Sequence, residues 1–239
     1  MFEILRRGIK GLLHYQPLEE TRALRAAIDA AREPGLPFCP PHQGDLLYTA
    51  IRRKSYRRCL QTGFLTGSTA LYMCAAAAET GGGVTSICMD DDDTVARGLR
   101  LLNEQDLSDR HTLIRGNSNR AIAEMFLAGE RFDFVFIDGW KTFDHLAYEL
   151  YLCNQMLETG GMIVFDDSHL PGVRMAIKLM RRFYGYRELD YSAWGQGGRI
   201  RLWQAISAAT LHRPYRAIEK AIETDSQPPF SDWTFHKNL

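Results

Sequence analysis

Short apolar runs alternate with amphipathic segments along most of this 239-residue chain. Each apolar run is closely followed by Gly, Asp or Asn, which is typical of a buried strand that ends in a turn. Each amphipathic segment repeats its apolar positions at helical spacing. The alternation predicts parallel strands joined by helical crossovers. The predicted strands are 59–60, 84–89, 111–115, 132–137 and 162–165, and the helices that follow them are 70–78, 94–104, 121–127, 145–157 and 172–182.

The pattern changes after the fifth helix. Residues 184–191 and 199–205 are β-like and flank Gly195–Gly198, which predicts an antiparallel hairpin. With the five parallel strands, this hairpin makes a seven-stranded sheet. We therefore predict an α/β fold that is doubly wound and Rossmann-like, with a mostly parallel sheet, a terminal antiparallel hairpin and helices on both faces.

A breaker-rich connector, Pro34–Pro41, separates an N-terminal helical cap (1–41) from the core (42–206). The cap contains a predicted helix at 17–33. Its opening segment predicts a helix docked on the chain itself or on a partner chain, with an interfacial membrane anchor as the alternative. Residues 207–239 predict a helix and a tail packed on the core.

Composition and charge narrow the class of function. Hydrophobic residues make up 45% of the chain and charged residues 24%, which is ordinary for a globular protein. Lys and Arg number 29, as do Asp and Glu, so no net field attracts nucleic acid. The five cysteines include no C-x-x-C pair, which favours a reducing, cytoplasmic compartment. No apolar run approaches the roughly 18 residues of a transmembrane span, and the opening segment is too broken to predict a signal peptide.

Glycines and polar side chains collect at the carboxyl ends of the predicted strands. In an open α/β sheet these ends meet at one edge, where ligands bind. The first end, Gln61–Thr69, has two glycines four residues apart before a helix, so its backbone can turn tightly and offer free N–H groups. It is neither the G-x-G-x-x-G of dinucleotide enzymes nor a phosphate-binding loop. The other ends carry Asp90, Asn117, Asp138 and Asp166.

Five segments follow the five strands in order: QTGFLTGST, VTSICMD, RGNS, FDFVFIDGWKTFDH and LETGGMIVFDD. Together they resemble class I S-adenosylmethionine-dependent methyltransferases, especially the small-molecule O-methyltransferases that include the catechol O-methyltransferase group. The resemblance covers roughly residues 42–206 and implies S-adenosylmethionine as cofactor. It also implies that Gly63, Gly67 and Thr69 shape the methionine pocket, and that Met89 and Asp90 hold the ribose. It further implies that Asn117 and Ser118 lie beside the adenine, and that Asp138 and Trp140 close the site.

Two positions depart from the family pattern. Members usually carry an acid where this chain has Gln61, and an Asp or Glu at the position of Cys88, where the ribose hydroxyls are expected. Cysteine is a weak acceptor. Asp90 would point to the same side of a continuing strand, so it is a candidate substitute. The alternative is that residues 90–93 form a solvated acidic run that favours a helix N-terminus.

Three carboxylates follow the fourth and fifth strands: Asp138, Asp166 and Asp167. Converging oxygen donors suit a hard cation such as Mg²⁺ or Ca²⁺. The resemblance to metal-dependent relatives implies that Mg²⁺ at matching positions chelates two neighbouring substrate hydroxyls and lowers their pKa. The alternative is that these carboxylates cap turns or contact the cofactor without a metal.

Lys141 is the candidate general base, because the Asp-x-Trp-Lys segment resembles that of the catechol group, whose lysine has this role. Other relatives tend to carry histidine at this place, and a solvated surface charge is the alternative reading. His145 and His169 flank the same region as candidates for a second base or a substrate hydrogen-bond partner, with a structural role as the alternative. Trp140 and Tyr151 are expected to form walls.

The leading hypothesis is a cytoplasmic S-adenosylmethionine-dependent O-methyltransferase that acts on a small hydroxylated molecule, such as a sugar or a polyphenol. The N-terminal helix also suggests a homodimer. Two alternatives come from other classes. Gln61 and Cys88 favour a non-catalytic relative that keeps the fold as a binding or scaffold module, whereas a nicotinamide oxidoreductase is disfavoured by the missing G-x-G-x-x-G.

Overall fold

The computed structural model describes residues 17–189 and 215–224. Its strands are β1 (Arg58–Thr62), β2 (Gly83–Cys88), β3 (His111–Arg115), β4 (Phe132–Ile137), β5 (Leu157–Phe165), β6 (Tyr186–Glu188) and β7 (Arg216–Lys220). Its helices are α2 (Arg22–Ala30), α3 (Pro41–Lys54), α4 (Ser68–Thr80), α5 (Asp92–Asn103), α6 (Ser118–Leu127), α7 (Phe143–Met156) and α8 (Pro171–Phe183), with a short 3-10 helix η1 (Ser108–Arg110).

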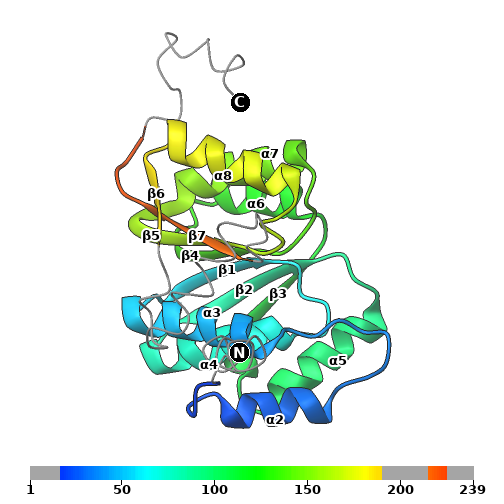
Figure 1. Cartoon of the computed structure of the whole chain (residues 1–239). Coiled ribbons are helices and arrows are strands. Elements are labelled where there is room, and N and C mark those ends of the chain that lie inside the picture. The colour runs from blue at the N-terminus through cyan, green and yellow to red at the C-terminus, as the bar shows by residue number, and fades with distance from the viewer. Residues whose placement is uncertain (1–16, 190–214, 225–239) are drawn as a thin grey trace, which may run out of the picture.

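The strands form one seven-stranded sheet in the order β3-β2-β1-β4-β5-β7-β6 (Figure 1). Strands β1 to β5 are parallel to one another. Strand β7 is antiparallel to both of its neighbours, β5 and β6. This confirms the predicted doubly wound α/β fold with a mostly parallel sheet and a terminal antiparallel pair.

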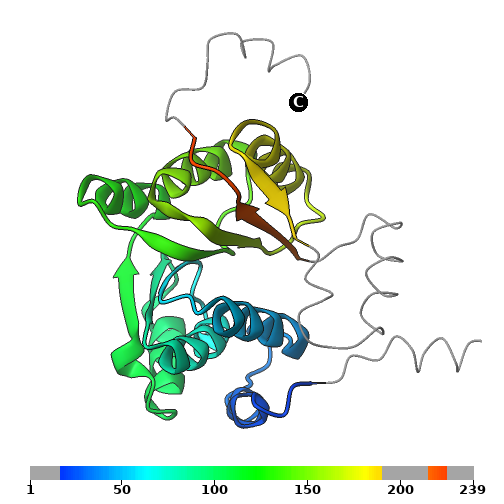
Figure 2. The ribbon, with the colours of Figure 1, turned by 90° about the vertical axis from the view of Figure 1, so that its left-hand side faces the viewer.

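Helices cover both faces of the sheet. Helices α2 to α5 lie on one face and α6 to α8 on the other, and Figure 2 shows the same two layers from the side. Because side chains alternate along a strand, Phe134 and Phe136 of β4 enter one apolar core while Val135 and Ile137 enter the other. This burial on both faces explains the unbroken apolar run of β4 in the sequence.

The described part of the predicted N-terminal cap packs directly on the core. Leu24 and Ile28 of α2 are buried in the same apolar cluster as α3 and α4. The buried carboxylate of Asp45 accepts hydrogen bonds from the backbone N–H of Leu18 and the hydroxyl of Thr21. Residues 17–30 are therefore tied to α3 by polar and apolar contacts. Within the described residues, no helix has the length and apolar character needed to cross a bilayer.

The end of the sheet differs from the prediction. Strand β6 corresponds to the first half of the predicted hairpin, but its partner is β7, in a segment that we expected to be a helix and tail. The expected strand at 199–205 lies outside the described residues, as do Gly195–Gly198 and residues 1–16. The sheet therefore extends beyond residue 206. Strand β5 is also longer than predicted, because Leu157 to Gly161 continue it backwards from Met162.

Candidate functional site

The glycine turn after β1 lies against the end of β4. Gly63 has a φ of +86°, and its N–H donates to the carbonyl oxygen of Ile87 at 2.9 Å. A Cβ on Gly63 would lie 2.6 Å from the backbone oxygen of Asp138. Gly67, with a φ of +69°, is the N-cap of α4, and a Cβ there would lie 2.8 Å from the Cα of Gly98. Both glycines are thus required by positive φ and by close backbone approach.

A chain of buried polar side chains runs beneath this turn. The amide nitrogen Nε2 of Gln61 donates to Oγ1 of Thr69 at 2.6 Å, and the Gln61 oxygen Oε1 accepts from the hydroxyl of Ser86 at 3.3 Å. Nε2 of His111 lies 2.9 Å from the same Ser86 hydroxyl, and the His111 ring stacks on Phe64 of the turn. Burial lowers the pKa of His111 to about 4, so its imidazole is neutral at pH 7. The Gln61 amide, which departs from the family pattern, therefore forms hydrogen bonds at both of its ends within this network.

The end of β2 is joined to the glycine turn by Asp90. Its Oδ2 accepts the backbone N–H of Leu65 at 2.9 Å. Cys88 is buried, and Nη1 of Arg115 contacts its sulfur at 3.3 Å while Nη2 donates to the backbone oxygen of Asp90 at 2.6 Å. Asp91 caps α5 by accepting the N–H of Thr94 at 2.8 Å. The expected helix N-terminus is present, because Asp91 caps α5, whereas Asp90 faces the glycine turn and its expected contact with a ribose stays a prediction.

The loop after β3 places Asn117 and Ser118 at the start of α6. Asn117 is exposed, and its side chain caps the helix by accepting the N–H of Asn119 at 3.0 Å. The hydroxyl of Ser118 lies 3.0 Å from Nε2 of His145, which also lies 3.0 Å from Oε1 of the buried Glu149. This Glu149 contact is the largest cause that raises the pKa of His145. His145 thus links α7 to α6.

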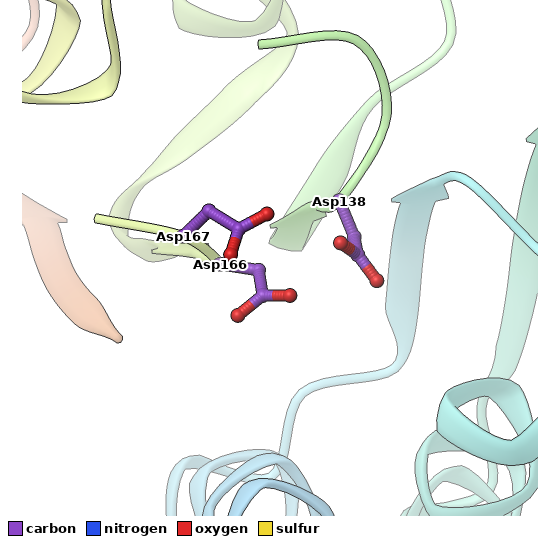
Figure 3. Close-up of side chains that lie close together, drawn as sticks. All are labelled: Asp138, Asp166 and Asp167. Carbon is purple, nitrogen blue, oxygen red and sulfur yellow. The ribbon is translucent and has the colours of Figure 1, made fainter. Parts of the chain in front are cut away.

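Three carboxylates converge at the ends of β4 and β5, as Figure 3 shows. One oxygen from each of Asp138, Asp166 and Asp167 lies within 4.8 Å of the others. Backbone hydrogen bonds fix the geometry, since the N–H of Asp138 donates to Thr62 and that of Asp166 to Ile137, both at 3.0 Å. Burial, together with the neighbouring Asp166, raises the pKa of Asp138 to about 7 against the opposing effect of a nearby lysine. We call these three residues the acidic cluster.

That lysine is Lys141, whose side chain is only 14% exposed. Its Nζ donates to Oδ1 of Asp138 at 3.0 Å and lies 3.5 Å from Oδ2 of Asp167. The alternative reading as a solvated surface charge therefore does not fit its burial. One ammonium faces three carboxyl groups, so the cluster keeps an excess of negative charge that suits a cation.

A polar pair near the acidic cluster, His42 and Tyr215, was not predicted from the sequence. The register of β5 and β7 pairs Phe165 with Arg216, which places Tyr215 level with Asp166 across the strand pair. The Tyr215 hydroxyl lies 2.9 Å from Nε2 of His42, at the start of α3. Burial lowers the pKa of His42, and the negative charge of Asp166 opposes this effect by raising it. This pair depends on contacts between distant segments, and no local motif marks either residue.

The remaining predicted site residues are exposed. The side chains of Met89 and Trp140 are 71% and 66% exposed, so they have room to fold over a ligand. Tyr151 is also partly exposed on α7. His169 is exposed, and its backbone oxygen accepts a hydrogen bond from Arg174.

Comparisons with known proteins agree with this architecture. Residues 60–168 match the family model described as a methyltransferase domain. The cofactor-bound protein Rv0187 from MTB has a TM-score of 0.61 and 19% identity over 84% of this chain and 89% of its own. An O-methyltransferase from Bacillus cereus has a TM-score of 0.61 and 18% identity over 72% and 84%, respectively. The O-methyltransferase TomG from Streptomyces achromogenes has a TM-score of 0.56 and 17% identity over 74% and 84%. No curated protein sequence matches significantly.

The matched residues run from the second half of β1 to just beyond Asp167, so they include the glycine turn and the acidic cluster. Residues 60–168 are therefore similar to a methyltransferase domain, and the fold agrees with the expected resemblance to the class I methyltransferases.

Proposed function

We propose that this protein is an S-adenosylmethionine-dependent O-methyltransferase that modifies a small hydroxylated molecule with the help of a divalent cation. The observation that carries the proposal is the convergence of the acidic cluster and Lys141 beside the glycine turn. The Bacillus cereus enzyme is in complex with S-adenosylhomocysteine and the Streptomyces achromogenes enzyme with S-adenosylmethionine, which supports the same cofactor here.

The residues of the glycine turn fit such a cofactor. When bound, S-adenosylmethionine supplies a methyl group on a positively charged sulfur, and this sulfur leaves when an acceptor oxygen attacks the methyl carbon. Gly63 and Gly67 keep the backbone close to the ligand, and Thr69 with the first N–H groups of α4 would hold its amino-acid end. Asp90 would face the ribose from the end of β2, and the amide nitrogen of Asn117 would face the adenine.

The donor set also fits a hard cation. Asp138, Asp166 and Asp167 offer carboxylate oxygens only, which are the ligands that Mg²⁺ and Ca²⁺ prefer. When bound, such a cation lowers the pKa of hydroxyl groups that it contacts. Burial, together with the neighbouring Asp166, raises the pKa of Asp138, and a bound cation would oppose both effects by stabilising the carboxylate.

We assign proton handling to Lys141 and positioning to His145. Lys141 is held by two acidic-cluster residues at the mouth of the site, within reach of an acceptor hydroxyl bound there. His145 bonds to Ser118 and Glu149 between two helices, so it would orient Ser118 rather than accept a substrate proton. The exposed Trp140 would cover the bound reactants and exclude water.

Calorimetric titration with S-adenosylmethionine and S-adenosylhomocysteine, with and without Mg²⁺, tests the proposal. We expect micromolar binding of both, which corresponds to about −8 kcal/mol. Titration of Mg²⁺ into the protein with S-adenosylhomocysteine bound should show a single site. A screen of catechols, polyphenols and sugars as methyl acceptors would then identify the substrate class.

Absence of binding by either ligand would contradict the proposal. The non-catalytic scaffold would then lead, since Cys88, whose sulfur contacts Arg115, stands where the resembling family carries a ribose-binding acid. Binding without cation dependence would retain the methyltransferase and remove the metal from it.

A further inference from the structure

The exposed face of helix α8 carries a row of positive charges. The sequence of the helix, PGVRMAIKLMRRF, contains cations and no acid, whereas the whole chain has equal numbers of both. Arg174, Lys178 and Arg182 recur every four residues and are exposed, while the opposite face of the helix is buried in the core. Residues four apart share one face of a helix and lie about 6 Å apart along its axis. We call these three residues the cation row.

A groove runs beside the cation row, where α8 packs against strand β6 (Figure 2). Its volume is about 580 Å³. Six residues line it: Lys178, Arg181, Arg182, Tyr186, Arg187 and Glu188. Four of these residues are cations and one is an acid, so the lining carries three more positive charges than negative ones. We call this groove the basic groove.

The acids near the basic groove do not neutralise it, because each is shared between two cations. Glu188 accepts hydrogen bonds from Arg181 at 2.8 Å and from Arg216 at 2.7 Å. Glu219, which pairs with Arg187 at 2.6 Å, also pairs with a lysine at 2.7 Å. The surplus of positive charge therefore remains, and it attracts an anionic ligand.

We propose that the basic groove binds an acidic segment of a partner protein, in an extended conformation with carboxylates at alternate positions. Side chains on one side of an extended chain repeat about every 6.6 Å. This repeat is close to the spacing of about 6 Å between successive members of the cation row. Alternate carboxylates would therefore each meet a cation. The inference goes beyond the proposed function and does not depend on it.

Other polyanions fit the basic groove less well. Single-stranded nucleic acid binds where its bases can stack on aromatic faces, but Tyr186, the aromatic residue of the lining, is only 4% exposed. A helix that lies on a membrane inserts exposed apolar side chains, and the lining of the groove offers none. A single phosphate group would use only part of the cation row. An extended chain of carboxylates uses its whole length.

The cation row begins beside the candidate site. In the first turn of α8, a Cβ on Gly172 would lie 2.5 Å from the backbone oxygen of Lys141. One turn further, Arg174 donates to the backbone oxygen of His169 at 2.9 Å, in the loop that follows the acidic cluster. A partner seated along α8 would therefore lie next to the acidic cluster.

Fluorescence anisotropy with two labelled peptides, at about 50 mM salt, tests the inference. One peptide alternates Glu with Ser, and the other carries the same number of Glu residues in one block, so that both have the same charge. We expect the alternating peptide to bind at a single site, at least about threefold more tightly than the block peptide. Its affinity should fall as the salt concentration rises.

Variants locate the binding. Lys178→Glu combined with Arg182→Glu should weaken binding of the alternating peptide at least about tenfold. The neutral pair Lys178→Gln and Arg182→Gln should weaken it less, and this pair decides the test if denaturation shows that the first variant does not fold. Arg22→Glu with Arg100→Glu is the matched control, because these exposed cations lie on α2 and α5, on the other face of the sheet. It makes the same change in net charge and should leave binding within about twofold.

Several outcomes would overturn the inference. Equal losses in the groove variant and the control would mean diffuse attraction without a site, and absent or equal binding of the two peptides would exclude the alternating segment. Tighter binding of pyrophosphate, or of a thymidine oligonucleotide of equal charge, would assign the groove to a phosphate ligand. Co-sedimentation with vesicles of phosphatidylcholine and phosphatidylserine that is lost in the groove variant would assign it to a membrane surface.

Discussion

The two halves of the candidate site differ in charge. On the side of β1 to β3, the buried polar groups are neutral, and Thr69, Gln61, Ser86 and His111 satisfy one another. On the side of β4 and β5, three carboxyl groups lie near one ammonium, and burial, together with the neighbouring Asp166, raises the pKa of Asp138. We refer to these as the neutral side and the acidic side.

The difference shows which side is complete without a ligand. A satisfied buried network holds its geometry and resists change. Carboxylates that crowd one another store repulsion, which a bound cation or a proton relieves. Under the proposed function, the neutral side would provide the shape of the site, and the acidic side would provide cation binding and proton transfer. The four predictions below test this division, from the largest expected effect to the smallest.

Removal of Asp166 should break the acidic side. We expect Asp166→Ala to lower turnover on an identified acceptor about a thousandfold, because the cation would lose a ligand. The same change should abolish stimulation by Mg²⁺ and leave the affinity for S-adenosylhomocysteine within about threefold. Asp109→Ala, at an exposed carboxylate on η1, is the control. Activity that persists in excess chelator would rule out the metal site.

Lys141→Ala should lower turnover about a hundredfold, which is the effect typical of a lost general acid or base. Affinity for S-adenosylhomocysteine should stay nearly constant, because Lys141 contacts the acidic cluster rather than the glycine turn. Lys141→Arg keeps the charge but does not exchange its proton near pH 8. The Lys141→Arg variant should therefore bind S-adenosylmethionine and S-adenosylhomocysteine normally, while its turnover stays low. Unchanged turnover in Lys141→Ala would remove the residue from the mechanism.

Gly63→Ala should disturb the contact between the two sides. The substitution places a Cβ at a φ of +86° and 2.6 Å from the Asp138 backbone oxygen, so we expect a loss of about 3 kcal/mol in the free energy of unfolding. Gly81→Ala is a matched control, since Gly81 has a φ of +73° with open space around it and should lose only about 1 kcal/mol. Chemical denaturation measures both, and equal losses would mean that the close approach at Gly63 is easily relaxed.

Acid should weaken the neutral side through His111. Its folded pKa of about 4 lies below the unfolded value of 6.5, so the unfolded chain binds the proton more tightly. The contribution of His111 is complete above pH 6.5 and declines as the pH falls towards 4. Between pH 7.5 and 5, wild-type protein should lose about 1–2 kcal/mol more stability than His111→Gln does. Parallel stability curves for the two proteins would contradict this assignment.

The sequence predicted the parallel part of the sheet because its central strands, such as β4, are buried on both faces and read as apolar runs. Strands β3 and β4 have the predicted bounds, and the residues at the ends of β1, β4 and β5 meet as expected. Strand β7 was missed because its sequence, RAIEK, reads as polar. Its buried charges are satisfied only in the fold, where Lys220 donates to the carbonyl oxygens of Asn154 and Leu157, and Glu219 accepts from Lys54.

Within the site, too, contacts between distant segments could not be predicted from local sequence. The carboxylates of the acidic cluster follow strands that are easy to recognise, so their convergence could be predicted. The role of Gln61 could not, because it depends on Ser86 and His111 in two other strands. His42 and Tyr215 meet only because β7 enters the sheet beside β5.

The position of β7 in the sheet means that the sheet cannot be completed until late in the synthesis of the chain. Strand β7 is made after β6 yet lies between β5 and β6 in the sheet. A nascent chain that has emerged only to residue 206 has an unpaired β5 edge, and β6 lacks its partner. Such an edge can pair with other chains and aggregate. The hydroxyl that contacts His42 belongs to Tyr215, which directly precedes β7. The His42–Tyr215 contact therefore forms only when β7 completes the sheet, late in synthesis.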